Sequence, residues 1–268
     1  MLLGLGLALA AILGSDLMDG GSVLALLNPS AALLVIGGTI GATMISSRWE
    51  DLMNLPGSLA TAFRSDATDL AGDVERVVAF AQKARREGLL SLEEDLASLD
   101  NAFLQRGLQM VIDGSDADAV RSVLRTEMAL RARAGRHRAS VFETAGGYAP
   151  TMGIIGTVMG LVRVLANLSN ANALGPSIAT AFLATFYGIS TANVFWLPLA
   201  SRLHNTVAEE QETLEVYLEG ILSIQAGDNP SLVRDKLMVF VERQGHTPTK
   251  GQGAETEGAA QTAEGRVA

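Results

Sequence analysis

The stretches GGYAPTMGIIGTVMGLVRVLANL (146–168) and GPSIATAFLATFYGISTANVFWLPLASRL (175–203) decide the fold of this chain. The first contains one charged side chain, that of Arg163, and the second contains none before its last two residues. A membrane-spanning helix needs about 20 predominantly apolar residues, and each stretch is long enough to supply them. The two stretches therefore predict two membrane helices, over 148–167 and 178–200, joined by a short loop.

Two further segments without charged side chains lie near the N-terminus, at 1–15 and 20–47. They predict a first membrane helix over 2–15, extended by a few residues, and a second over 29–46. The first segment has an alternative interpretation as a secretory signal peptide, because its letters LALAA resemble a cleavage site. We favour a membrane helix, because no Lys or Arg precedes the apolar run and a second apolar segment follows closely.

The composition of the whole chain agrees with a membrane protein. Among its 268 residues 48% are apolar and 18% are charged, against about 25% charged in soluble domains. The lack of cysteine excludes a disulfide scaffold and thiolate chemistry, and the three histidines have no metal-ligand spacing. The net charge of −9 argues against a nucleic-acid partner, because phosphate binding needs a basic face. An enzyme is the least expected class, since no nucleophile–base pair or phosphate loop appears.

The distribution of Lys and Arg predicts the orientation in the membrane. Thirteen of the 20 basic residues lie in 48–143 and six in 202–268. The predicted connections 16–28 and 168–177 contain none. Both charged regions, and with them the N- and C-termini, are therefore expected in the cytoplasm. The predicted fold class is an all-α integral membrane protein, with four transmembrane helices in two hairpins and a helical cytoplasmic domain.

The charged regions show helical periodicity. In DVERVVAFAQKARREG (73–88) the apolar residues fall on one stripe opposite the charges, and Gly88 is a helix stop signal. SLEEDLASLDNAFLQRGLQMVID (91–113) is a second amphipathic run. The last residues lack any periodicity and are expected to be disordered. We divide the chain into membrane helices one and two (1–47), a cytoplasmic helical domain (48–143), membrane helices three and four (144–203), a cytoplasmic helical extension (204–244) and a disordered tail (245–268).

Small residues follow one face of each C-terminal membrane helix. Such residues allow the backbone of another helix to approach closely. We therefore expect them to form a helix-packing surface. They are Gly153, Gly156 and Gly160 on the third helix, and Ala184 and Gly188 on the fourth.

The same two helices carry hydroxyl groups, among them those of Thr157 and Thr185. Membrane hydroxyls either bond back to their own helix or line a polar path for an ion, and the spacing leaves both open. None of the four predicted spans contains an acidic residue, although ion relays through membranes usually rely on an intramembrane carboxylate. If this chain conducts an ion, a partner must supply that carboxylate.

Three further residues stand out in the C-terminal spans. Pro150 and Pro198 lie near the predicted cytoplasmic ends of the third and fourth helices. They predict either a mild kink in each helix or a paired hinge between the membrane and the cytoplasmic domain. Arg163, near the outer end of the third helix, either snorkels to the interface or lines a polar interior.

These motifs resemble the MotA/PomA family of flagellar stator subunits, within the wider MotA/TolQ/ExbB group. The resemblance extends to about Val241, and the two stretches quoted first are its most specific part. VIGGT, ARREGLLSLEED, RGLQMVIDGSDADAVRSVL and ILSIQAGDNP occur around them in the right order. Four helices with a large loop between the second and the third resemble MotA/PomA more than TolQ/ExbB, which have three helices.

The resemblance implies an ion-conducting stator subunit of the flagellar motor in the bacterial inner membrane. It implies a homopentamer, bathed in membrane lipid, around two copies of a MotB- or PomB-like B subunit. That B subunit is anchored to peptidoglycan and brings the ion-binding aspartate. No cofactor is implied beyond the transported sodium ion or proton, and the cytoplasmic domain is implied to turn the rotor protein FliG.

Particular residues match the family's functional positions. Arg85 and Glu93 match the charged pair that contacts the rotor, and Glu94 and Asp95 extend it; without the resemblance they would be interpreted as a solvated helix face. In the membrane, Pro150 and Pro198 match two prolines tied to conformational coupling, Thr185 matches the hydroxyl near the B-subunit aspartate, and Thr157 matches a position that tends to be Thr in sodium-driven members and Ala in proton-driven ones.

Ion choice follows from ligand chemistry. Sodium is a hard cation that needs several oxygen ligands, and Thr157 and Thr185 with backbone carbonyls could supplement one carboxylate. We therefore expect sodium in preference to a proton. Asn28 argues against sodium, because some sodium-type members carry an aspartate near that position. Two other functions remain open: an ion-driven motor subunit of another envelope system (Tol/Ton-type, gliding or defence), and a membrane scaffold without transport.

Overall fold

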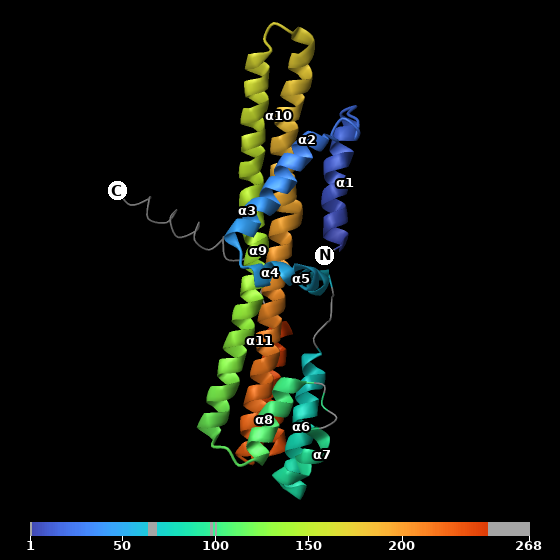
Figure 1. The fold of residues 1–268 in the computed structure, drawn as a ribbon. Helices are drawn as coiled ribbons and strands as arrows, with labels where there is room; N and C mark the ends of the chain where they lie inside the picture. The colour runs from blue at the N-terminus through green and yellow to red at the C-terminus, as the bar shows by residue number, and fades with distance from the viewer. Residues whose placement is uncertain (1, 64–68, 97–98, 100, 246–268) are drawn as a thin grey trace, which may run out of the picture. The chain divides into compact units, whose positions relative to one another are not determined.

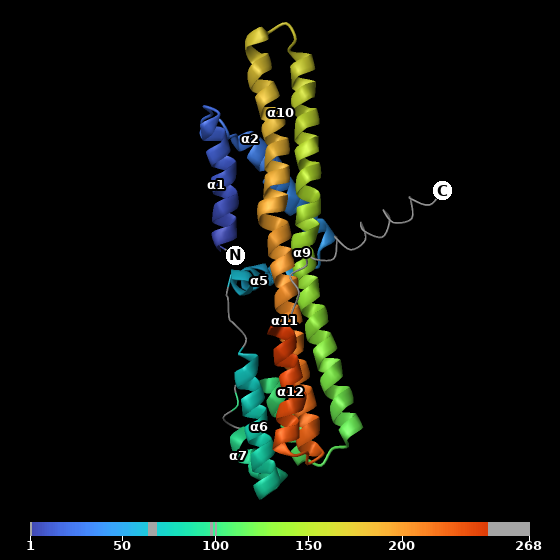
Figure 2. The same ribbon diagram turned by 180° about the vertical axis from the view of Figure 1, so that it is seen from behind.

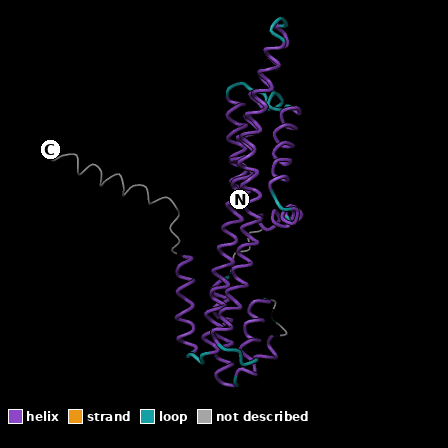
Figure 3. Tube along the Cα trace, turned by 60° about the vertical axis from the view of Figure 1, so that its left-hand side comes forward, coloured by secondary structure: helices purple, strands orange, loops and turns teal. Residues whose placement is uncertain are grey.

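The computed structural model describes residues 2–63, 69–96, 99 and 101–245. Every regular element among these residues is a helix (Figure 3), which confirms the predicted all-α class. The tail predicted to be disordered lies, from residue 246 on, outside the described residues. The chain divides into unit 1, made of residues 1–67 and 129–210, and unit 2, made of 68–128 and 211–268.

Unit 1 contains the apolar helices. Three segments are long and apolar enough to cross a membrane: Pro29–Ser46 and windows within Ala117–Ala166 and Leu174–Gln225. A shorter apolar helix, α1 (Leu2–Met18), precedes them and contacts η3 (Ala192–Trp196). Only 22% of the residues in each of the three windows are buried within this chain. Most of their surface is therefore available to lipid or to other chains.

The second apolar span is three consecutive helical pieces, α2 (Pro29–Ala32), the π-helical turn η1 (Leu33–Gly37) and α3 (Gly38–Ser46). Asn28 caps its start, because the Asn28 side chain accepts a hydrogen bond from the Ala31 N–H at 3.0 Å. Pro29 follows at the first helical position, where its missing N–H costs nothing. Two short helices, α4 (Trp49–Met53) and α5 (Leu55–Phe63), come after the span.

The last two spans are longer than a membrane requires. α9 is a single helix, Ala117–Ala166, and α10 (Ala171–Thr191) returns beside it (Figure 1). The π-helical turn η3 then leads into α11 (Leu197–Gln225). α9 and α11 each contribute residues to both units.

Unit 2 contains α6 (Leu70–Glu87), α8 (Ala102–Ile112) and α12 (Pro230–Gly245), together with the unit 2 residues of α9 and α11. The apolar stripe predicted within 73–88 is buried in its core, and α6 and α12 lie side by side (Figure 2). The largest fully buried side chains of this core include Phe103, Leu104, Leu108, Leu124, Ile221 and Leu237.

The ends of the unit 2 helices follow from local chemistry. Gly88 has a φ of +88°, which a residue with a side chain rarely adopts, and α6 ends before it as predicted. The run predicted at 91–113 is not one helix. The turn η2 (Leu89–Leu92) leads into the short α7 (Glu93–Leu96), and α8 starts separately. It starts there because the Asn101 side chain caps it, accepting from the backbone N–H groups of Phe103 and Leu104.

Candidate functional site at the α9–α10 seam

The seam between α9 and α10 is lined by glycine and alanine. A Cβ atom placed on Gly156 would lie 2.4 Å from the Cβ of Ala184, and one on Gly160 would lie 2.4 Å from the Cβ of Ala181. Carbon atoms in proteins do not approach this closely, so these positions hold no side chain larger than hydrogen unless the helices separate. The predicted packing glycines of the third span thus lie against α10.

The two backbones approach one another one turn further along. A Cβ on Gly153 would lie 2.9 Å from the carbonyl oxygen of Ala184, and one on Gly188 would lie 2.6 Å from that of Ala149. Here the obstruction is backbone, which cannot move aside as a flexible side chain can. All five predicted packing residues therefore line one interface.

Thr157 and Thr185 meet within this seam. Their Oγ1 atoms form a hydrogen bond with each other, and Thr157 Oγ1 also lies 3.1 Å from the carbonyl oxygens of Gly153 and Ala181. A hydroxyl carries a single proton, so it donates to only one acceptor at a time. The result is a half-buried cluster of four oxygen atoms between two apolar helices. Thr157 therefore lies within hydrogen-bond distance of the Gly153 carbonyl on its own helix and of two oxygen atoms on α10.

The two predicted hinge prolines occupy different surroundings. Pro150 belongs to the seam, because a Cβ on Gly188 would lie 3.2 Å from its Cα. Pro198 is exposed and is the second residue of α11, directly after the π-helical turn η3. Each lacks the N–H that would bond the preceding turn, and a π-helical turn also departs from the regular bonding pattern.

A second polar cluster, which was not predicted from the sequence, ties the start of α2 to α10. The Asn28 backbone N–H donates to the Tyr187 hydroxyl oxygen at 2.8 Å, and the Asn28 side-chain amide donates to Thr180 Oγ1 at 3.0 Å. The Tyr187 hydroxyl in turn donates to the carbonyl of Leu26. Asn28 followed by proline is a capping signal readable in the sequence. The tyrosine contact has no local signal, since its partners lie far away along the chain.

Arg163 lines a cavity of about 280 Å³ at the same end of unit 1 as this cluster. Ser30 and Thr180 contribute hydroxyl-bearing side chains to the cavity wall, and Gly156 and Gly160 contribute backbone. The Arg163 side chain is exposed. Its surroundings within the chain are thus partly polar.

The residues matched to rotor contact lie in unit 2. Arg85 is in the last turn of α6, and Glu93 and Glu94 open α7; all three are exposed. Asp95 is different, because its Oδ2 lies 2.7 Å from Lys83 Nζ. This hydrogen bond to Asp95 raises the pKa of Lys83, with further help from nearby acidic side chains. Asp95 thus ties α7 to α6, whereas the side chains of Glu93 and Glu94 stay in solvent.

These features define a class: a helical membrane protein whose spans pack through glycine and enclose hydroxyls. The chain belongs to the MotA/TolQ/ExbB proton channel family, whose model matches residues 95–216, and the model of the motility protein A N-terminal family matches residues 2–88. The resemblance to MotA/PomA is confirmed.

Individual relatives agree with the family. Motility protein A of Bacillus subtilis (strain 168) is 35% identical over 96% of both chains. Chemotaxis protein PomA of Vibrio alginolyticus is 33% identical over 83% of this chain and 87% of its own. The flagellar MotAB stator complex from Bacillus subtilis matches with a TM-score of 0.85 and 35% identity, over 90% of this chain and 95% of that one. The prediction of a flagellar stator ion-channel subunit is confirmed.

The seam predicts the effect of enlarging Gly156. In a Gly156→Leu variant the new side chain would collide with Ala184 and with Leu34. We expect the helices to separate and the stability to fall by about 1–3 kcal/mol, the usual cost of overpacking. Thermal melting of the detergent-solubilised assembly measures this, and cryo-microscopy shows whether the oligomer forms. Val158→Leu, at an exposed neighbouring position, is the matched control. A normal oligomer with an unchanged melting temperature would refute the packing argument.

Proposed function

We propose that this stator subunit passes its ion along the α9–α10 seam, beside a carboxylate that a B subunit supplies. The observation that carries the proposal is the Thr157–Thr185 oxygen cluster, which lies in spans without any acidic residue. Hydroxyls and carbonyls can strip water from a cation, but they cannot take up a proton or balance a charge as a carboxylate does. The solved relatives are named as MotAB complexes, which supports a MotB-type partner.

The proposed topology has four transmembrane helices, with α1 as the first. Its 17 residues extend over about 26 Å at 1.5 Å per residue, slightly less than the hydrocarbon thickness of about 30 Å. A short helix is accommodated by local thinning of the bilayer. With the basic residues inside, both termini lie in the cytoplasm and the protein is a multi-pass component of the inner membrane.

The proposed assembly is a homopentamer around two B subunits. The low burial of the apolar windows supports it, because much of their surface is left for other chains or lipid. The half-buried Thr157–Thr185 cluster needs a polar neighbour on its open side, since lipid offers none. A B-subunit helix with a carboxylate at that depth would provide one.

Sodium is the proposed ion. Four oxygens from Thr157, Thr185, Gly153 and Ala181 already converge, and a hard cation is held by such a set better than by one carboxylate. Asn28 brings a neutral side-chain amide, which already donates to Thr180, while the Asn28 backbone N–H donates to the Tyr187 hydroxyl. Because Asn28 is neutral, a negative charge at the channel mouth would have to be supplied by another residue or another chain.

The function itself is tested by complementation. A flagellated strain without stators should regain swimming when this chain is expressed with its B subunit, and should remain paralysed with intact filaments when either is expressed alone. The proposal requires the carboxylate of the partner. Cation flux through vesicles that contain this chain by itself would therefore contradict it, as would paralysis with both subunits present in the membrane.

Removal of the seam hydroxyls should weaken the use of sodium. In Thr157→Ala the ion loses one ligand, and a loss of about 1.4 kcal/mol raises the half-saturating sodium concentration roughly tenfold. Swimming speed against sodium at fixed proton-motive force measures this. Thr157→Ser retains the hydroxyl and serves as the control, and the Thr185 pair of variants repeats the test. Equal sodium dependence in the Ala and Ser variants would remove Thr157 from the ion path.

Rotor contact is proposed for Arg85, Glu93 and Glu94, with Asp95 placing α7. Charge pairs of this kind steer orientation more than they add affinity. Arg85→Glu should lower the torque at high load while ion flux through the open channel is retained. Arg121→Glu, on an exposed arginine that pairs within α9, controls for the change in net charge. A tethered-cell torque–speed curve that is unchanged for Arg85→Glu combined with Glu93→Arg would argue against contact.

A further inference from the structure

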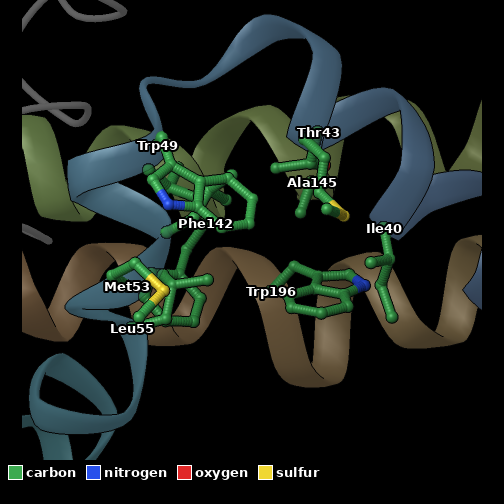
Figure 4. A pocket seen from close by; sticks show the side chains of 11 residues that line it. Ile40, Thr43, Trp49, Met53, Leu55, Phe142, Ala145 and Trp196 are labelled. Atoms are coloured by element: carbon green, nitrogen blue, oxygen red, sulfur yellow. The ribbon is translucent and has the colours of Figure 1, made fainter.

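An apolar cavity of about 260 Å³ lies in unit 1, away from the α9–α10 seam residues (Figure 4). On one side it is walled by the end of α3 and by α4, and on the other by α9 and η3. Figure 4 shows these side chains around an open centre. Its lining includes Ile40, Trp49, Met53, Phe142, Ala145 and Trp196.

Aromatic rings dominate one end of the cavity. The rings of Phe142 and Trp196 have centroids 6.4 Å apart, and Trp49 is 66% exposed although it lines the cavity. The chain has two tryptophans, and both are here. Tryptophan is enriched where a membrane meets water, since its ring is apolar and its N–H polar. The cavity thus has the composition of a site at the membrane border.

Two basic residues, Arg138 and Arg48, lie close in the chain to residues that line the cavity. Arg138 precedes Val141 and Phe142 by one helical turn of α9, so it shares their face about 6 Å nearer the N-terminus. No ion pair to Arg138 occurs among the residues that the structure describes, and Arg138 is half-buried. Arg48 directly precedes Trp49. Its pair with Glu50, at 2.9 Å, is mostly in solvent, and pairs of this kind are held weakly.

Two of the three acidic groups nearby have a partner, whereas Asp51, also on α4, lies beside the cavity residue Leu52. Glu143, the next residue after Phe142, lies 3.0 Å from His204 Nε2 on α11. Glu50 contacts Arg48. Within the described part of the chain, Arg138 is therefore a cation without an ion pair, one helical turn from the lining of an apolar cavity.

We propose that this cavity binds an anionic phospholipid, with part of one acyl chain among the aromatic rings and the phosphate on Arg138 and Arg48. A helix of another chain, about 10 Å across with its side chains, is too wide for a space of 260 Å³. A flexible hydrocarbon chain fits it. Juxtamembrane basic residues attract anionic headgroups. The assignment to the cytoplasmic leaflet rests on the proposed topology, whereas the lipid chemistry does not.

The bound lipid would extend a contact that α5 already makes with α9 and α11 through Ala62, Phe142 and Leu199. Met53 and Leu55 bring the α4–α5 segment to one wall, and Ala145 belongs to α9. An acyl chain between them fills the space and holds that segment against the long helices. The site thus concerns the anchoring of the segment that follows the second span, and not ion passage.

The two tryptophans allow a direct test. The complex of this chain with its B subunit is placed in phosphatidylcholine vesicles with a small fraction of phospholipid brominated along its acyl chain. Bromine quenches nearby indole fluorescence. The signal of the double variant Trp49→Phe/Trp196→Phe is subtracted to remove the tryptophans of the partner. We expect brominated phosphatidylglycerol to quench several-fold more than brominated phosphatidylcholine at the same mole fraction.

Two variants separate the headgroup from the acyl chain. Arg138→Gln should abolish the preference for phosphatidylglycerol, whereas Arg121→Gln, in unit 2, should retain it. Ala145→Leu should fill the cavity and reduce quenching by either lipid. Circular dichroism and the oligomer size show that each variant folds. Equal quenching by the two lipids in the natural sequence would overturn the proposal, as would an unaltered preference in Arg138→Gln. Sodium flux in the same vesicles reports separately on the proposed function.

Discussion

The close approach of the α9 and α10 backbones is the constraint that shapes the membrane part of this protein. At Gly153 and Gly188 the obstruction to any side chain is backbone on the opposite helix, so the distance between the helices is set by the absence of side chains. That distance brings Thr157 and Thr185 into contact. A wider spacing would leave each hydroxyl bonded to its own helix alone. The polar cluster therefore forms because the two helices pack closely, and they pack closely because glycine has no side chain.

The same constraint explains how an apolar span can contain a polar site. A hydroxyl that faces hydrocarbon has no partner except its own backbone. In the seam, Thr157 has a choice of three acceptors, on its own helix and on its neighbour. The two carbonyl acceptors lie at the same distance, 3.1 Å, so the hydroxyl proton can change from one to the other without being left unsatisfied.

Local patterns allowed a good part of this to be predicted from the sequence. The lack of charges located the spans, and the 3.6-residue period placed Gly156 and Gly160 on one face. What remained hidden depends on register between distant segments. The contact between Tyr187 and Leu26, the pairing of Lys83 with Asp95, and the wall formed by Trp49 and Trp196 each join residues that no local pattern relates. The split of the 91–113 run came from one cap, Asn101, whose signal the apolar period obscured. The π-helical turns in two spans had no predicted counterpart.

The division into two units fits a stator in which different forces act in each part. Unit 2 is held by a core of large side chains around Phe103 and Leu124, which is stable in water because it removes apolar surface from solvent. Unit 1 contains apolar windows that are only 22% buried within the chain and, inside a membrane, gains nothing from hiding their apolar surface from lipid. Its cohesion must come from close packing, from the Asn28–Tyr187 bonds and from neighbours outside the chain. The two units thus depend on different interactions: directional contacts and close backbone approach in unit 1, and a dense apolar core in unit 2.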